Sequence, residues 1–423
     1  MRFYFPDSQD LVSPTYDFIH DEYSPLRVRQ RDDLYAHEVL ARVPYDGILV
    51  SKAIVDGSVS GAGKYSESQR QRIYRLGVRR FFRLPDNMAT IGDCGAFNYV
   101  GEYEPPYSVD EVIDFYDGCR FDAGVSVDHV ILGYDRAATK ATTDPAWKAR
   151  QAITLRLAQD FIGAVERRAS QVEPVASAQG WSPASYAESV RVLQGLGFRR
   201  IGLGGMVPLK TPDILACLEA IGEIRLPEVE LHLLGVSRIE SMEMFAKYGV
   251  TSFDSTSPFK QAFMDDRDNY HTASGTYVAI RVPQVDGNVS LKRAILAGHV
   301  SQRDALRLER ECLSRLRRLD AGEVGVEDVL SVLADYETII GVKKSRLAEY
   351  HRTLEAAPWR DCLCGLCGRH GVEMIIFRGT ERNKRRGFHN LSVLAGRMHS
   401  IPALAARRSA TRMTAVQQGS VSG

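Results

Sequence analysis

The stretch PVASAQGWSPASYAESVRVLQGLGFRRIGLGGM, residues 174–206, decides the fold class. It opens with a short apolar run, continues as an amphipathic helical pattern over 182–197, and returns to an apolar run at 200–206. Ser182 is suited to cap the free N–H groups of the helix, and Gly197 suits its end. Because two strands joined through a helix pair in parallel with a right-handed crossover, this stretch predicts an α/β fold.

The same rhythm extends over most of the chain. Candidate strands are GILVSKAIV (47–55), ATIGDCG (89–95), AGVSVDHV (123–130), PVASAQG (174–180), RIGLGGM (200–206), ELHLLGV (230–236), TSFDST (251–256) and EMIIFRG (373–379). Helical patterns between them cover 108–116, 143–169, 182–197, 211–224 and 237–249. Eight strands suit a closed (β/α)8 TIM barrel, although periodicity alone fits a doubly wound sheet as well.

Composition sets broad limits. With 44% hydrophobic and 25% charged residues, the 423-residue chain has the profile of a soluble globular protein. The start MRFYFPDSQDLV lacks the features of a signal peptide, and no segment offers about 18 uninterrupted apolar residues, so we expect a cytoplasmic protein without membrane contact. The net charge of +1 argues against a globally basic nucleic-acid binder but allows local patches, such as RNKRRG (382–387) and ARRSATR (406–412).

Unusual polar residues fall at the ends of successive candidate strands. They are Asp93, Asp128, Gln179, Gly204, Gly205, Gly235 and Asp254. In a barrel these ends converge on one face, where the βα loops build the active site. A single carboxylate at such a place is commonly a helix cap, but three of them together with a Gln and a Gly-Gly pair are harder to explain by capping.

Paired carboxylates suit chemistry at an anomeric carbon. One can attack or stabilise an oxocarbenium-like centre while the other moves a proton to the leaving group. A third carboxylate beside a Gln and exposed Gly backbone can read a purine, because a guanine edge presents N–H donors and the O6 acceptor. The combination indicates an enzyme acting on glycosidic or nucleosidic bonds.

A cysteine cluster indicates a metal site. Three of the seven cysteines, Cys362, Cys364 and Cys367, lie within one hexapeptide, which argues against a disulfide framework. With His389 they form a closed set of three thiolates and one imidazole, typical of structural Zn²⁺. His370 is a rival for the fourth position.

Six ordered segments resemble the tRNA-guanine transglycosylase family. GDCGAFNYV (92–100) looks like its DSGGFQ motif, SVDHV (126–130) like its base-reading Asp segment, and ASAQG (176–180) like its QQG. GLGGM (202–206) is similar to its GGL loop, while LLGV (233–236) and SFDSTSP (252–258) resemble LMGVG and FDCVLPTR. The resemblance covers roughly residues 45 to 260 and the cysteine cluster. It implies a TIM barrel that exchanges a nucleic-acid base.

The resemblance also implies individual roles. Asp254 would be the nucleophile on C1′, and Asp93 the general acid/base for the departing and arriving bases. The base-binding residues that it implies are Asp128, Gln179, Gly204 and Gly205 along the base edge, with Phe97 and Leu234 stacking on the ring. Without the resemblance, Phe97 and Leu234 would be read as core packing.

Departures from the tRNA pattern indicate one branch of the family. The first motif has Cys94, Ala96 and Asn98 where the family has Ser, Gly and Gln. FYFPDSQDLVSPTYDF (3–18) and RQRDDLYAHE (29–38) resemble the DpdA branch, which exchanges guanine in DNA for 7-cyano-7-deazaguanine (preQ0) within a DNA-modification system. This implies DNA and preQ0 as substrates and an ATPase as partner, and we also expect a homodimer.

Basic residues between the last cysteine and His389 suggest a contact with nucleic-acid phosphates. We expect Arg382, Lys384, Arg385 and Arg386 to form a phosphate-facing loop. Two alternatives stay open for the whole chain: a transglycosylase acting on tRNA, and a non-catalytic nucleic-acid-binding subunit. A hydrolase of nucleoside bonds would use similar carboxylates but insert no base.

The predicted domain organisation has five parts. Residues 1–45 are an N-terminal extension packing on the barrel, and 46–290 hold barrel strands one to seven. A helical insertion at 291–357 precedes a zinc-binding segment with the last barrel strand at 358–405. The Ser-, Gly- and Gln-rich end, 406–423, is a disordered tail by composition.

Overall fold

The computed structural model describes residues 1–401 apart from 8, 58–62 and 139–141. The chain divides into two compact units. Of the described residues, the barrel unit comprises those within Met1–Gln9 and Tyr45–Thr256 together with 398–401, and the second unit comprises Asp10–Pro44 and Ser257–Arg397. The predicted tail at 406–423 and the basic run at 406–412 lie outside the described residues.

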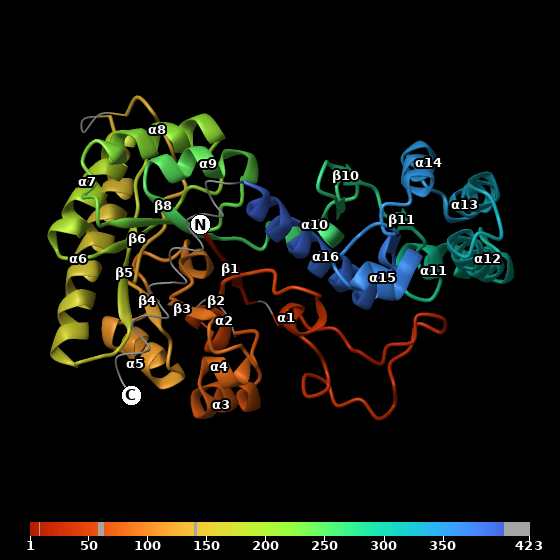
Figure 1. Cartoon of the computed structure of the whole chain (residues 1–423), viewed down its shortest axis with the longest axis horizontal. Coiled ribbons are helices and arrows are strands. Elements are labelled where there is room, and N and C mark those ends of the chain that lie inside the picture. Colours follow the sequence, from red (N-terminus) through yellow and green to blue (C-terminus); the bar gives the residue numbers. More distant parts are fainter. Residues whose placement is uncertain (8, 58–62, 139–141, 402–423) are drawn as a thin grey trace. The chain divides into compact units, whose positions relative to one another are not determined.

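The barrel unit contains a closed barrel of eight parallel strands that pair in chain order (Figure 1). The strands are β1 (Arg2–Pro6), β2 (Gly47–Ser51), β3 (Ala89–Asp93), β4 (Ala123–Val125), β5 (Glu173–Ala178), β6 (Arg200–Leu203), β7 (Glu230–Leu233) and β8 (Val250–Asp254). The predicted (β/α)8 barrel is confirmed. All its strands therefore end on one face, which brings their last residues together.

The strand that closes the barrel is not the predicted one. β1 pairs with β2 on one side and with β8 on the other, where Tyr4 lies opposite Asp254. The expectation that residues 1–45 pack on the barrel as an extension is thus wrong: residues 2–6 are a barrel strand, and 10–44 belong to the second unit. Three consecutive side chains of β1, Phe3 to Phe5, are buried, as expected for a strand covered on both faces.

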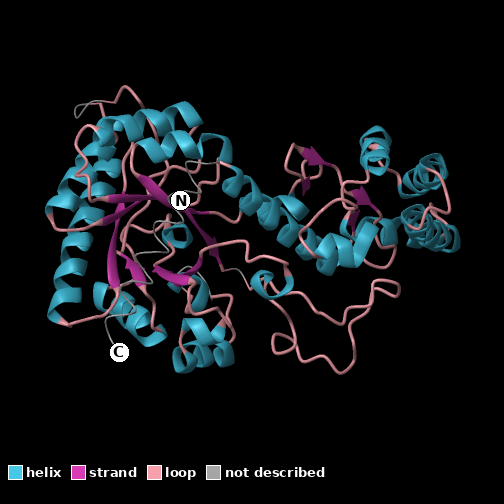
Figure 2. Ribbon diagram, in the orientation of Figure 1, coloured by secondary structure: helices cyan, strands magenta, loops and turns pink. Residues whose placement is uncertain are grey.

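Helices surround the strands of the barrel unit (Figure 2). They are α2 (Lys52–Val55), α3 (Glu67–Leu76), α4 (Val78–Phe81), the 3-10 helix η1 (Ala96–Tyr99), α5 (Val109–Cys119), α6 (Pro145–Arg167), α7 (Pro183–Gly195), α8 (Thr211–Gly222) and α9 (Ile239–Lys247). Ser108 and Ser182 cap α5 and α7 by accepting a backbone N–H from the third helical residue. The five predicted helices of this region are all present.

Apolar side chains from neighbouring strands fill the barrel. A buried cluster joins Tyr4, Leu49, Ile91, Ala123, Val125 and Val175, with Leu234 packed against it. This part of the interior is therefore a packed apolar core.

The second unit is mainly helical. Its elements are α1 (Ala36–Val39), α10 (Ser257–Met264), β9 (Tyr270–His271), β10 (Thr276–Tyr277), β11 (Ile280–Arg281), α11 (Val289–Leu296), α12 (Gln302–Asp320), α13 (Val326–Ile340), α14 (Leu347–Ala356), α15 (Leu366–His370), the 3-10 helix η2 (Gly371–Met374), β12 (Ile376–Phe377) and α16 (Gly379–Ser400). The predicted helical insertion at 291–357 corresponds to α11–α14.

The run EMIIFRG (373–379) is not a barrel strand. Only Ile376 and Phe377 are extended, and they pair in parallel with β11 in the second unit. The apolar run resembles a barrel strand because a buried segment of a helical subdomain can have the same composition as a buried strand. No helix among the described residues is long and apolar enough to cross a membrane.

Candidate active site

The predicted polar residues gather at the carboxyl end of the barrel. Asp93 is the last residue of β3 and Asp254 the last residue of β8. Asp128 lies three residues beyond β4, and Gln179 directly follows β5. Asp93 is electrostatically coupled to both of the other carboxylates, so the barrel brings the three acidic groups into one site.

Asp128 is held by three neighbours. Its Oδ2 accepts hydrogen bonds from Ser177 Oγ at 2.7 Å and Gln179 Nε2 at 2.6 Å. Its Oδ1 accepts a longer contact from Cys94 Sγ at 3.3 Å. Burial raises the pKa of Asp128, while the hydrogen bonds from Ser177, Cys94 and Gln179 oppose that rise. The Asp128 carboxyl group is thus fixed in position, and its pKa is raised.

The amide of Gln179 is oriented by the backbone beside it. Its Oε1 accepts the N–H of Ile131 at 3.1 Å, which leaves Nε2 to face Asp128. Gly205 has φ +72°, and a Cβ on either Gly204 or Gly205 would collide with the Gln179 amide or the Ile131 carbonyl. The Gly-Gly pair is therefore needed for the amide to lie against the β6 loop.

Asp254 accepts two hydrogen bonds on one oxygen. His232 Nε2 lies 3.1 Å from Asp254 Oδ1, and the backbone N–H of Gly235 donates to the same atom at 3.0 Å. His232 Nδ1 lies 2.9 Å from Ser252 Oγ. Asp254 is 7% exposed, which leaves a small part of it accessible.

Asp93 has a displaced protonation equilibrium. Burial, with the charges of Asp128 and Asp254 as smaller contributions, raises its pKa to about 7. The backbone N–H of Gly95 donates to its Oδ2 at 2.9 Å and opposes the rise. A carboxyl group with a pKa near neutrality can both give and take a proton at physiological pH.

The two predicted stacking residues differ in burial. Phe97 lies on η1 and is 52% exposed, and Leu234 is partly buried against the barrel core. The exposure of the Phe97 ring argues against the alternative that this residue is part of the core. Their stacking on a base stays a prediction.

Sequence reasoning missed the residues that support the carboxylates. Ser177, His232 and Ser252 each lie two positions before a residue at a strand end, namely Gln179, Leu234 and Asp254. Because side chains alternate along a strand, residues two apart point to the same face. Polar residues two positions before each strand-end residue are the signal that could have found them.

Comparison with known proteins agrees with this arrangement. No protein-family model matches the sequence. A DNA-guanine transglycosylase of Salmonella montevideo is 47% identical over 404 residues, which span 94% of this chain and 96% of that protein. The chain belongs to the DNA-guanine transglycosylase family. As a member of this family it is a glycosyltransferase of the base-exchange type, and the resemblance inferred from the motifs is confirmed.

The second unit of this transglycosylase holds a cluster of side chains that could bind a metal ion. The sulfurs of Cys362, Cys364 and Cys367 and one imidazole nitrogen of His389 lie within 4.8 Å of one another. Three thiolates and one imidazole can complete a tetrahedral shell around one metal ion.

His389, not His370, completes the cluster. The Nδ1 atom of His389 lies 3.4 Å from both Cys362 Sγ and Cys367 Sγ. Its Nε2 faces the His271 carbonyl oxygen at 2.8 Å, which places the ring hydrogen there and leaves the Nδ1 lone pair facing the cysteine sulfurs. His370 instead makes an edge contact with Phe18.

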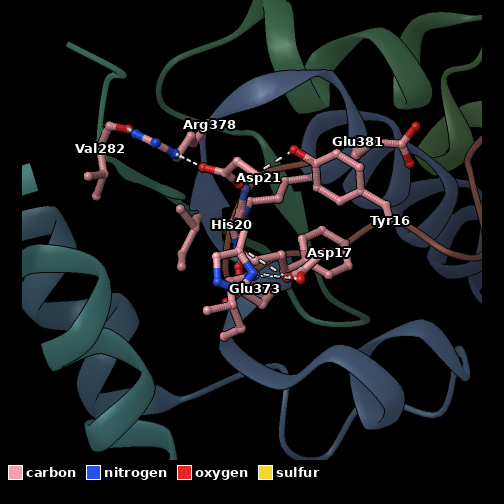
Figure 3. Close-up of polar contacts among 12 residues, drawn as sticks. Tyr16, Asp17, His20, Asp21, Val282, Glu373, Arg378 and Glu381 are labelled. Carbon is pink, nitrogen blue, oxygen red and sulfur yellow. Dashed lines mark hydrogen bonds and ion pairs between the residues drawn. The ribbon is translucent and has the colours of Figure 1, made fainter. Parts of the chain in front are cut away.

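The expectation of a phosphate-facing loop at 382–386 is wrong. The segment is part of helix α16, and Arg382, Arg385 and Arg386 are at most 2% exposed. Arg382 binds Asp21 and Glu373. Arg378, just before the helix, binds Asp21 at 2.6 Å (Figure 3). Buried guanidinium groups require such partners, so these cations are committed within the second unit.

The remaining cations of that segment are also occupied. Arg385 pairs with Glu381, and Arg386 donates to the backbone carbonyls of Ala262 and Ile376. Lys384 Nζ lies 3.6 Å from Asp10 and keeps 23% of its side chain exposed. Lys384 alone of the four retains appreciable access to solvent.

Proposed function

We propose that this chain exchanges guanine in DNA for 7-cyano-7-deazaguanine (preQ0) through a covalent intermediate on Asp254. The observation that carries the proposal is the pairing of an anchored, largely buried carboxylate with a second carboxyl group whose pKa lies near neutrality. Such a pair can split a base exchange into two displacements at one carbon. The Salmonella relative carries the name of a DNA-guanine transglycosylase, which supports DNA as the polymer.

In the first displacement, an oxygen of Asp254 forms a bond to C1′ as the bond from C1′ to the guanine nitrogen breaks. The electron pair leaves with the base, and protonated Asp93 supplies the proton that neutralises it. In the second, the incoming base gives a proton to Asp93 and its nitrogen attacks C1′. The C1′–oxygen bond then breaks and its electron pair returns to Asp254.

The base would be read by Asp128, Gln179 and the Gly204–Gly205 backbone. A carboxylate accepts the N–H groups of a guanine edge, and an amide or backbone N–H serves its O6 atom. These groups lie at the ends of β4, β5 and β6. A target guanine must leave the DNA stack to reach them, which costs a few kcal/mol in a duplex.

The cysteine cluster would hold Zn²⁺ in a structural role. Its four ligands leave no open position for a reactant, and they belong to the second unit, whereas Asp93 and Asp254 belong to the barrel unit. The motif resemblance further supports a place in a DNA-modification system with an ATPase partner.

The test measures base exchange directly. The protein, with and without the ATPase of its modification system, is incubated with radiolabelled guanine and either duplex DNA or tRNA. We expect label in DNA, loss of incorporation in Asp254→Ala, and preQ0 nucleoside in digested DNA by mass spectrometry when preQ0 is supplied. Label in tRNA alone would assign the protein to RNA, and full activity of Asp254→Ala would refute the covalent route.

A further inference from the structure

The two oxygens of Asp254 have different environments. Oδ1 faces two donors, His232 Nε2 at 3.1 Å and Gly235 N at 3.0 Å. Within the part of the chain that the structure describes, no hydrogen bond to Oδ2 is present. The carboxylate therefore has one anchored oxygen and one free oxygen.

The hydrogen-bond chemistry of His232 fixes its tautomer. An ionised carboxylate only accepts hydrogen bonds, so the imidazole nitrogen that faces Asp254 must carry the hydrogen. Nδ1 is then the acceptor and takes the hydroxyl hydrogen of Ser252 at 2.9 Å. The chain from Ser252 through His232 to Asp254 thus runs in one direction.

The surroundings of His232 keep the ring in place and neutral. It lies on β7, is 3% exposed, and makes an edge contact with the ring of Tyr4 at 5.8 Å. Burial lowers its pKa, and the nearby charges of Arg200 and Arg2 act in the same direction. Asp254 and its hydrogen bond oppose this lowering but do not outweigh it.

The second donor is set by backbone conformation. Gly235 has φ +76°, and a Cβ there would lie 2.7 Å from Val207 Cγ2. Only glycine adopts this conformation without strain, which aims the N–H at Oδ1. A backbone donor cannot be removed by mutation of its side chain, so His232 is the donor that an experiment can delete.

We propose that His232 is a positioning residue that anchors Oδ1 of Asp254, so that Oδ2 is the oxygen that bonds to C1′. This inference rests on the proposed function, because it assigns an atom within that covalent step. The Oδ2–C1′ bond forms while the bond to guanine breaks, and the base departs with the electron pair and a proton from Asp93. Oδ1 becomes the carbonyl oxygen of the ester.

The same two donors then act in the second displacement. As the C1′–Oδ2 bond breaks, negative charge returns to the carboxylate and is shared with Oδ1. Hydrogen bonds already aimed at that oxygen stabilise the developing charge without reorganisation. Anchoring would therefore favour formation of the intermediate by orienting Oδ2, and its breakdown by stabilising the returning charge.

The experiment compares three variants under conditions in which the unsubstituted chain exchanges guanine in DNA. His232→Phe keeps a flat ring but removes the donor, whereas His232→Gln can return an N–H to Oδ1. Ser252→Ala removes the bond that selects the tautomer. We expect His232→Phe to lower kcat about 100-fold with little change in KM. His232→Gln should regain at least a tenth of the original kcat, and Ser252→Ala should fall between the two.

Several results would overturn the inference. They are an unchanged kcat in His232→Phe, or a His232→Gln variant that folds with the original melting temperature but is as slow as His232→Phe. A crystal structure of the trapped adduct should show the ester at Oδ2, with Oδ1 still accepting from Gly235; an ester at Oδ1 would equally contradict it. Asp254→Ala separates the two proposals, because continued exchange in that variant removes the proposed function itself.

Discussion

Gln179 Nε2 donates to Asp128 Oδ2 at 2.6 Å, so the amide and the carboxylate proposed to read the base form one bonded pair. The orientation of the pair is set from both sides, by the Ile131 N–H on the amide oxygen and by Ser177 on the carboxylate. Recognition groups held in this way lose little conformational freedom when a ligand binds. A substitution of Asp128 or Gln179 should therefore change the affinity for the base more than the rate of the chemical step.

Asp128→Asn should weaken guanine binding. It replaces a carboxylate that can accept two N–H groups with an amide that presents one acceptor. A hydrogen bond to a charged group contributes about 1.5–3 kcal/mol, which corresponds to a rise in the KM for guanine of roughly 10- to 100-fold. Ser177→Ala, which leaves the carboxylate in place, is the matched control and should change KM less. Equal KM values for Asp128→Asn and the unsubstituted chain would contradict the base-reading role.

Exchange should fall as the pH rises through neutrality. The raised pKa of Asp93, about 7, means that its protonated form predominates below that pH and is lost above it. Because the departing guanine takes its proton from Asp93, kcat/KM for base release should decrease on the alkaline side. In Asp93→Asn this limb should vanish and turnover should drop by about 100-fold or more. The pH dependence of both proteins checks this, and a limb near pH 7 that survives in Asp93→Asn would assign it to another group.

Metal removal should loosen the second unit first. We expect one Zn²⁺ per chain, lost in Cys364→Ser and retained in Cys312→Ser, since Cys312 is a buried cysteine of the same unit outside the cluster. A structural zinc site contributes on the order of 10 kcal/mol to local folding. Chelation should therefore increase amide hydrogen exchange in α15 and α16 before it does so in β2–β8. Uniform exchange across both units, or zinc retention by Cys364→Ser, would contradict this assignment.

Arg382→Ala should destabilise the protein without weakening phosphate contacts. Removing one member of a buried ion-pair network costs about 3–5 kcal/mol, because Asp21 and Glu373 keep their charges without the partner. Lys384→Ala, on the same helix but partly exposed, is the control and should change unfolding free energy by less than about 1 kcal/mol. Urea unfolding measures both. If Arg382→Ala kept the original unfolding free energy but showed a weaker salt dependence of DNA binding, Arg382 would be assigned a contact with a DNA phosphate after all.

Seven of the barrel strands could be predicted from sequence because apolar runs alternate with helical patterns, although the predicted run 47–55 also takes in helix α2 (Lys52–Val55). The first strand could not, since Arg2–Pro6 is followed by an irregular polar segment rather than a helix. The run EMIIFRG is predicted as the eighth strand in place of Arg2–Pro6, because an apolar run carries no information about its partner strand. Pairing between β1 and β8 depends on residues far apart in the chain, which local patterns do not contain.

The candidate site shows the same division. Asp93, Asp128 and Asp254 could be predicted because strand ends converge in a barrel, whereas the hydrogen bonds from Ser177 and His232 depend on side-chain geometry. Arg382 could not be told from a surface cation, because its partner Asp21 is more than 350 residues away along the chain. A run of charged residues in the sequence shows only the local composition. Whether those side chains are buried depends on their partners in the tertiary structure.

The pairing of β1 with β8 has a consequence for biosynthesis. A ribosome adds about 5–20 residues per second, so the segment containing Tyr4 emerges on the order of 10–50 s before Asp254, its neighbour in the finished sheet. During that interval an apolar strand has one unpaired edge, which is the kind of surface that aggregates or recruits chaperones. The yield of soluble protein from rapid overexpression should therefore improve with slower translation or lower temperature, more than with substitutions that stabilise the folded protein.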